Sequence, residues 1–173
     1  PHVISTSFPN SREQIMAAVI SLRKELQQQQ IPLEIFPGGE YRLEADLPQR
    51  IQQGTVLTLN DSARYILIEL PSSVLPPFFE RVMYDIQLQG VTPIIAHPER
   101  NQVIMENPLI LQSMTERGIL AQITATSITG EFGKTIKKSS RQLIKQGSAH
   151  FVASDAHYHS GRRSPKLSAA RAE

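Results

Sequence analysis

Apolar residues follow two kinds of spacing along the chain. From Ser11 onward they recur every three or four positions, which predicts an amphipathic helix. These residues are Ile15, Val19, Leu22 and Leu26. Ser11 and Gln14 have the spacing of a capping box, so we expect the helix to begin there. Short continuous apolar runs predict buried strands instead. The predicted strands are residues 31–36, 65–70, 91–96, 119–124 and 150–154.

Helical patterns follow the predicted strands. The further predicted helices are residues 43–53, 77–90, 108–117 and 134–146, with the start of another at 164–173. Residues 124–133 are polar and predict a loop. Regular alternation of strand and helix predicts an α/β fold, with a parallel sheet or a (β/α) barrel joined by right-handed crossovers. No linker interrupts the pattern, so we expect a single domain over residues 1–173.

The amino-acid composition argues against several classes of protein function. Lys and Arg number 18 against 16 Asp and Glu, and the net charge of +2 does not indicate a nucleic-acid or membrane-surface protein. No apolar run approaches the roughly 20 residues of a membrane span, and no signal-peptide pattern is present. We therefore expect a cytoplasmic protein without membrane insertion. The chain has no cysteine, which excludes disulfides, thiolate metal sites and cysteine-nucleophile catalysis.

Side chains able to bind metal lie at the ends of predicted strands or of a strand-like start. They are His2, Glu40, Glu69, His97, Asp155 and His157. The carboxyl ends of parallel strands share one face, where active sites form. Imidazoles combined with carboxylates suit Zn, Mn or Fe better than Ca or Mg. The sequence therefore predicts a metal site at one rim of the sheet.

Each candidate also has a simpler structural interpretation. His97 could be a loop histidine, Glu69 a salt-bridge partner and Glu40 a helix or turn cap. His2 is terminal, and terminal residues are commonly without a role. The set as a whole, rather than any single residue, favours the metal site. The Gly130–Thr135 segment ends like a phosphate-binding P-loop, but the motif requires a glycine where Ile128 stands, so that interpretation is excluded.

A phosphoryl-transfer role is consistent with these candidates. Arg100 follows His97 by three residues, and its planar guanidinium could hold phosphate oxygens. Two divalent ions held about 4 Å apart can lower the pKa of a bound water toward about 7 and clamp a phosphoryl group.

Several segments together resemble the PHP-type (polymerase and histidinol phosphatase) bacterial protein-tyrosine phosphatases that are encoded with capsule and exopolysaccharide genes. They are YILIE (65–69), DIQLQG (85–90), VTPIIAHPER (91–100), FGK (132–134) and HFVASDAH (150–157). The resemblance extends over nearly the whole chain, in order and at consistent spacing. It implies a distorted (β/α)7 barrel that binds up to three divalent ions at its C-terminal rim, commonly Mn, with Zn, Fe or Co as alternatives.

The resemblance also implies roles for individual residues. It places metal ligands at His2, Glu40, Glu69, His97, Asp155 and His157. It places phosphate-binding arginines at Arg100 and Arg162, with Arg163 as an adjacent competitor for the second role. The implied reaction is metal-dependent hydrolysis of phosphotyrosine by metal-activated hydroxide. The implied substrate is the tyrosine-rich tail of a bacterial tyrosine kinase that regulates polysaccharide export, and the protein could form oligomers.

The chain departs from this family at its ends. The family begins with an Asp-x-His-x-His strand, and this pattern is absent here. We therefore expect an incomplete barrel that lacks the first strand and helix and the end of the last helix. Two other hypotheses remain open. The chain could be a PHP phosphoesterase that acts on a small phosphate ester of the histidinol phosphate type, or an inactive fragment with only a binding role.

Overall fold

The computed structural model describes residues 1–161 and 163–172. The chain divides into two compact units, Pro1–Glu69 with Pro77–Pro93 (unit 1) and Leu70–Pro76 with Ile94–Glu173 (unit 2). The elements of unit 1 are β1 (His2–Val3), α1 (Arg12–Gln28), β2 (Glu40–Arg42), α2 (Leu47–Gln52), η1 (Leu59–Asp61), β3 (Tyr65–Glu69) and α3 (Phe79–Leu88). β4 (Thr92–Ala96) begins in unit 1 and ends in unit 2.

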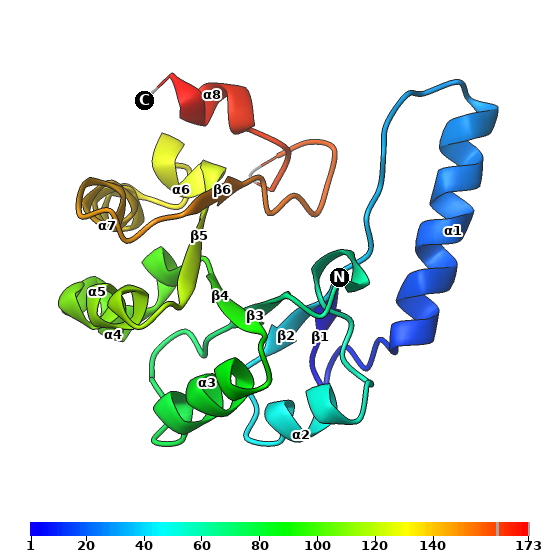
Figure 1. Cartoon of the computed structure of the whole chain (residues 1–173). Coiled ribbons are helices and arrows are strands. Elements are labelled where there is room, and N and C mark those ends of the chain that lie inside the picture. The colour runs from blue at the N-terminus through cyan, green and yellow to red at the C-terminus, as the bar shows by residue number, and fades with distance from the viewer. Residues whose placement is uncertain (162, 173) are drawn as a thin grey trace. The chain divides into compact units, whose positions relative to one another are not determined.

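Unit 2 continues with short helices and two further strands. Its elements are η2 (Pro98–Arg100), α4 (Gln102–Glu106), α5 (Leu109–Glu116), β5 (Leu120–Thr124), α6 (Ala125–Thr129), α7 (Lys134–Lys145), β6 (Phe151–Ala153) and α8 (Leu167–Arg171). Figure 1 shows these elements along the chain. Within each unit neighbouring strands run parallel: β1, β2 and β3 in unit 1, and in unit 2 the residues of β4 from Ile94 onward with β5 and β6. The predicted α/β fold class is confirmed.

The cores of both units come from strand and helix residues with β-branched or long apolar side chains. In β3 the side chains alternate between buried and half-buried, because successive residues of a strand point to opposite faces. In β4, by contrast, all four residues from Pro93 to Ala96 are buried, as expected for a strand covered on both faces. Strands β3, β4 and β5 and helix α7 lie where the sequence predicts them, and Ser11 caps α1 with the predicted capping box. Strand β6 also lies where predicted, but Phe151 and Val152 are exposed, so the prediction that this strand is buried is wrong.

The strand predicted at residues 31–36 is wrong. This segment is irregular, and the strand that pairs with β1 is Glu40–Arg42. Ile31, Leu33 and Phe36 are exposed, so the apolar run is not the signature of a buried strand. The Arg23 guanidinium donates two hydrogen bonds to the Ile35 carbonyl, which connects the segment to helix α1. The backbone of this segment is therefore hydrogen-bonded to a helix side chain at Ile35 and not to a neighbouring strand.

The loop predicted at residues 124–133 is also partly wrong. Residues Ala125–Thr129 form helix α6, and four of its residues, Ala125 to Ile128, are buried. Small and hydroxyl side chains give the segment its polar composition. Two of these hydroxyls have partners inside the fold, because Ser127 donates to Glu99 and Thr129 donates to the Thr126 carbonyl. Gly130 then ends the helix in a left-handed conformation.

No helix in the part of the chain that the structure describes has both the length and the apolar character needed to cross a bilayer.

Replacing Tyr41 with phenylalanine is expected to lower the free energy of unfolding by about 1–2 kcal/mol. The Tyr41 side chain is 1% exposed, and its hydroxyl oxygen accepts a 2.6 Å hydrogen bond from the backbone N–H of the fully buried Leu57. Burial raises the pKa of Tyr41, so the hydroxyl stays neutral. Phenylalanine leaves the Leu57 N–H without this acceptor. Urea unfolding measures the loss, and Tyr84→Phe, at an exposed position of α3, should change stability by less than about 0.5 kcal/mol.

Candidate functional site

The predicted metal ligands fall into two groups of three. His2, Glu40 and Glu69 belong to unit 1, and His97, Asp155 and His157 belong to unit 2. The first three are called the histidine–glutamate cluster below. The residues of unit 2 that surround Arg100 are called the arginine cluster: Glu99, Arg100, Thr124, Asp155, His157 and Arg163. The two clusters are described in turn.

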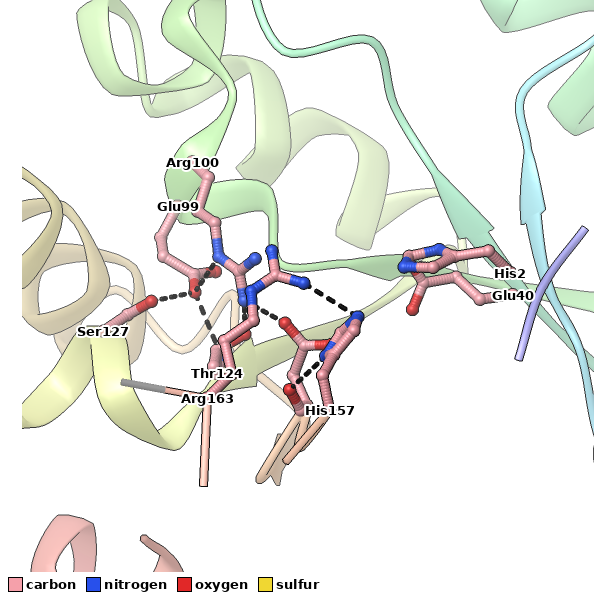
Figure 2. Close-up of polar contacts among 9 residues, drawn as sticks. His2, Glu40, Glu99, Arg100, Thr124, Ser127, His157 and Arg163 are labelled. Atoms are coloured by element: carbon pink, nitrogen blue, oxygen red, sulfur yellow. Dashed lines mark hydrogen bonds and ion pairs between the residues drawn. The ribbon is translucent and has the colours of Figure 1, made fainter. Parts of the chain in front are cut away.

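Strand pairing assembles the histidine–glutamate cluster. His2 of β1 is the register partner of Glu40 on β2, and Glu69 ends β3, the next strand along. The Nδ1 atom of His2 lies 3.3 Å from Oε1 of Glu40 (Figure 2 labels both residues). One nitrogen or oxygen atom from each of the three residues lies within 4.8 Å of the others. The structure therefore brings together three of the six predicted ligands.

Gly39 permits this close approach. A Cβ atom at position 39 would lie 2.8 Å from the Tyr41 ring and 3.2 Å from a methyl group of Val3 on β1. Both neighbours are buried and cannot move aside easily. Glycine therefore lets β2 lie tightly beside β1, which places Glu40 next to His2.

The donor set of the histidine–glutamate cluster fits a divalent ion. Two carboxylates and an imidazole, all half-buried, suit Mn, Zn or Fe. Atoms bound to one ion at about 2.0–2.2 Å are at most about 4.4 Å apart, so small side-chain movements would bring all three onto one ion. Arg42 Nη1 lies 3.5 Å from Glu69 Oε2 and balances part of the negative charge.

In unit 2, a tight turn after β4 directs the side chains of the HPER motif. His97 adopts a left-handed conformation (φ 36°, ψ 52°), and its N–H donates to the Gln122 carbonyl at 2.8 Å. Asp155, after β6, also has a positive φ of 48°. Left-handed backbone costs a non-glycine residue about 1–3 kcal/mol and concentrates at functional sites. Two of the predicted ligands thus occupy strained positions, which favours a functional interpretation.

Glu99 points inward from this turn and is completely buried (0% exposed). Its Oε1 atom accepts hydrogen bonds from the Thr124 N–H at 3.0 Å and from the Ser127 hydroxyl at 2.6 Å (Figure 2). Burial raises the pKa of the Glu99 carboxyl, and the hydrogen bonds from Ser127 and Thr124 oppose that rise. Glu99 therefore fastens η2 to the start of α6. The sequence analysis did not include Glu99 among the site residues, because its partners Thr124 and Ser127 lie far along the chain and no local pattern indicates the contact.

Arg100 is the centre of the arginine cluster. Its Nη2 atom donates to Thr124 Oγ1 and Asp155 Oδ2, and its Cζ atom lies 4.7 Å from the centroid of the Phe132 ring. Burial alone would raise the pKa of Asp155, but the hydrogen bond and charge of Arg100, with smaller contributions from His97 and His157, lower it overall. Asp155 is therefore held as a carboxylate, the form that binds metal.

His157 connects Asp155 to a second arginine. Its Nδ1 atom lies 2.9 Å from the Asp155 carbonyl oxygen and 3.8 Å from the Asp155 carboxylate, and its Nε2 atom lies 2.7 Å from Nη1 of Arg163 (Figure 2). The Arg163 carbonyl accepts from the His157 N–H at 2.8 Å and closes the loop. Arg162, the predicted second phosphate-binding residue, lies outside the described residues. Its sequence neighbour Arg163 contacts this cluster through His157.

The comparisons with known proteins agree with one another. A family model described as capsular polysaccharide synthesis, CpsB/CapC, matches residues 1–173. The chain is 42% identical over 157 residues to tyrosine-protein phosphatase YwqE of Bacillus subtilis (strain 168), covering 91% of this chain and 61% of that protein. It is 28% identical over 166 residues to tyrosine-protein phosphatase CpsB of Streptococcus pneumoniae, covering 90% of this chain and 68% of that protein.

A solved structure is similar as well. It comes from a study of YwqE from Bacillus subtilis and CpsB from Streptococcus pneumoniae, described as unique metal-dependent tyrosine phosphatases. The TM-score is 0.91 at 40% identity, and the match covers 98% of this chain and 68% of that one. The chain thus spans about three fifths of the length of YwqE.

Proposed function

Since the chain belongs to the CpsB/CapC family of capsular polysaccharide synthesis, we propose that it is the core of a metal-dependent phosphatase that hydrolyses phosphotyrosine in proteins. The observation that carries this proposal is the histidine–glutamate cluster, whose three donor groups lie within 4.8 Å of one another. Relatives at 42% and 28% identity are named tyrosine-protein phosphatases, which supports the reaction class. Residues 1–173 would form one phosphatase domain of the PHP type.

The proposed roles of the residues follow from their chemistry. In unit 1, His2, Glu40 and Glu69 would hold a divalent ion, Mn in the first instance. In unit 2, His97, Asp155 and His157 are also proposed as metal ligands. A divalent ion bound there would supply Lewis acidity to the phosphoryl group and lower the pKa of water. Arg100 and an arginine of the 162–163 pair would hold the phosphoryl oxygens by charge-assisted hydrogen bonds. Glu99 would keep the turn that carries Arg100 in place.

The natural substrate would be a protein phosphorylated on tyrosine, and the proposed one is the tail of a bacterial tyrosine kinase of polysaccharide export in the cytoplasm. An aryl phosphate has a better leaving group than an alkyl phosphate, because a phenol is more acidic than an alcohol. We therefore expect faster hydrolysis of a phosphotyrosine peptide than of the same peptide with phosphoserine, by at least about tenfold in kcat/KM. Phosphate release from the two peptides, with Mn²⁺ present, tests this. Equal rates, or a preference for phosphoserine, would refute the proposed substrate class.

Replacing Arg100 with lysine is expected to lower kcat/KM for the phosphotyrosine peptide by about 30-fold, while the amount of bound Mn²⁺ stays the same. Lysine keeps the charge but lacks the planar fork, so it cannot contact Thr124, Asp155 and a phosphoryl oxygen together. Steady-state kinetics with parallel metal analysis measures both quantities. Arg81→Lys, on the exposed surface of α3, is the matched control and should leave kcat/KM unchanged. A kcat/KM of Arg100→Lys equal to that of the control would remove Arg100 from the proposed site.

A further inference from the structure

The contacts of Arg100 leave one edge of its guanidinium available. Nη2 donates hydrogen bonds to Thr124 and Asp155, and Nε lies 3.9 Å from Glu99 Oε1. Nη1 makes no hydrogen bond or ion pair with any residue in the ranges 1–161 and 163–172. Because a guanidinium carries two N–H groups on Nη1, this edge retains two donors for an oxyanion.

The Phe132 ring packs against the Arg100 guanidinium but accepts no hydrogen bond from its N–H groups. The Arg100 Cζ atom lies over the ring at 4.7 Å from its centroid, well inside the range of a cation–π contact of about 6 Å. A phenyl ring offers no lone pair, so the N–H groups of Arg100 stay available for oxygen acceptors. The hydrogen bonds that Nη2 donates fix that nitrogen atom only, and the plane of the guanidinium could still turn. Contact with the ring restricts that rotation.

The turn that carries Phe132 is built to hold it in place. The Gly133 N–H donates to the Gly130 carbonyl at 2.9 Å, and both φ values are positive, 93° at Gly130 and 99° at Gly133. Side chains other than glycine are strained in this region, so the two glycines define the turn. Glu131 makes a 2.7 Å ion pair with Lys166, which ties the turn to the segment before α8. Phe132 is thereby anchored from both sides, although its own ring is only half-buried.

We propose that Phe132 is a positioning residue, which holds the guanidinium of Arg100 so that its Nη1 edge faces the phosphoryl group of the substrate. This inference rests on the proposed function, in which Arg100 binds phosphate. It adds to that function a residue from a different element, the turn between α6 and α7. Phe132 itself would not exchange protons or coordinate metal, and its effect would be on the affinity for the phosphoryl group.

The test is calorimetric binding of inorganic phosphate to the Mn²⁺-loaded chain. Phe132→Leu should weaken phosphate binding by about tenfold, the loss expected when a partly desolvated cation–π contact is removed. Phe132→Met should behave like Phe132→Leu, whereas Phe132→Tyr keeps an aromatic face and should bind phosphate within about twofold of the unaltered chain. Phe36→Leu, at an exposed position in unit 1, is the matched control and should have no effect. All variants should bind the same amount of Mn²⁺.

A second readout does not depend on phosphate or metal. The ring current of Phe132 should shift the NMR signal of the Arg100 side-chain Nε–H, and Phe132→Leu should remove that shift while Phe132→Tyr preserves it. Unaltered signals in Phe132→Leu would overturn the contact itself.

The outcomes separate this inference from the proposed function. If Arg100→Ala binds phosphate as tightly as the unaltered chain, or if the unaltered chain binds none, the proposed function fails, and the inference fails with it. If Arg100→Ala weakens binding but Phe132→Leu and Phe132→Met do not, the proposed function stands and Phe132 has no positioning role.

Discussion

Replacing Glu69 with alanine is expected to weaken Mn²⁺ binding by at least about 100-fold and to abolish phosphotyrosine hydrolysis. Glu69 supplies one of the three donor atoms that lie within 4.8 Å of one another, so its removal leaves His2 and Glu40 as the remaining pair of this cluster. A second effect acts in the same direction, because Arg42, 3.5 Å from Glu69, would lose this carboxylate as a neighbour of its positive charge. Calorimetry measures the loss of Mn²⁺ affinity, and hydrolysis of the phosphotyrosine peptide measures the loss of activity.

The control for this experiment is Glu34→Ala, which removes an exposed carboxylate from the same unit. It should bind Mn²⁺ and hydrolyse the peptide like the unaltered chain. Circular dichroism should show both variants folded, since neither change removes a core side chain. Mn²⁺ affinity that is the same in Glu69→Ala and Glu34→Ala would exclude Glu69 as a ligand.

Replacing Glu99 with alanine is expected to lower the free energy of unfolding by about 3 kcal/mol. The change would leave the buried Thr124 N–H and Ser127 hydroxyl without their common acceptor and would open a cavity under η2. Denaturant unfolding measures the loss directly. Because Glu99 adjoins Arg100, phosphate binding should weaken as well, even under conditions where the variant remains folded.

Glu99→Gln separates the hydrogen bonds from the charge. Glutamine keeps an oxygen that can accept from both Thr124 and Ser127, so this variant should retain most of the stability lost in Glu99→Ala. Glu106→Ala, on the exposed side of α4, should change stability by less than about 0.5 kcal/mol. A loss in Glu99→Ala no larger than that of the Glu106→Ala control would mean that Glu99 does not fasten the turn.

The sequence predicted the fold class and the ends of the main strands because both depend on local patterns. β3 and β4 are apolar runs that stop at Glu69 and His97, and a charged or polar residue after a buried run marks the rim of a parallel sheet. That rule accounts for Glu69 alone in the histidine–glutamate cluster. His2 and Glu40 are the first residues of β1 and β2, and the register partner of Glu69 is Arg42, so the closeness of the three depends on strand pairing that the sequence did not predict. Their role as metal ligands remains a prediction.

Other features depend on contacts between distant residues, which no local pattern contains. The apolar run at residues 31–36 has the composition of a strand, but its backbone is tied to Arg23 instead of to a neighbouring strand. Helix α6 has a polar composition, and its burial depends on acceptors such as Glu99. The role of Glu99 likewise requires Thr124 and Ser127, 25 and 28 residues further along the chain, to come to the same place.

The sequence could not decide for a similar reason whether Arg162 or Arg163 is the second phosphate-binding arginine. The two arginines are adjacent and chemically identical, so spacing from Asp155 cannot distinguish them. The contact between Arg163 and His157 depends on how the loop folds back on itself. Phosphate binding by Arg162→Ala and Arg163→Ala would decide which of them holds the phosphoryl group.

The most direct test of the central claim is the metal requirement of phosphotyrosine hydrolysis. The chain is first dialysed against EDTA, and its turnover of a phosphotyrosine peptide is measured before and after Mn²⁺ is added. The account predicts that dialysis abolishes turnover, that Mn²⁺ restores it, and that Glu69→Ala is not restored at the same Mn²⁺ concentration. Turnover that survives EDTA, or that fails to appear with Mn²⁺, would contradict the proposal that this chain is the core of a metal-dependent tyrosine phosphatase.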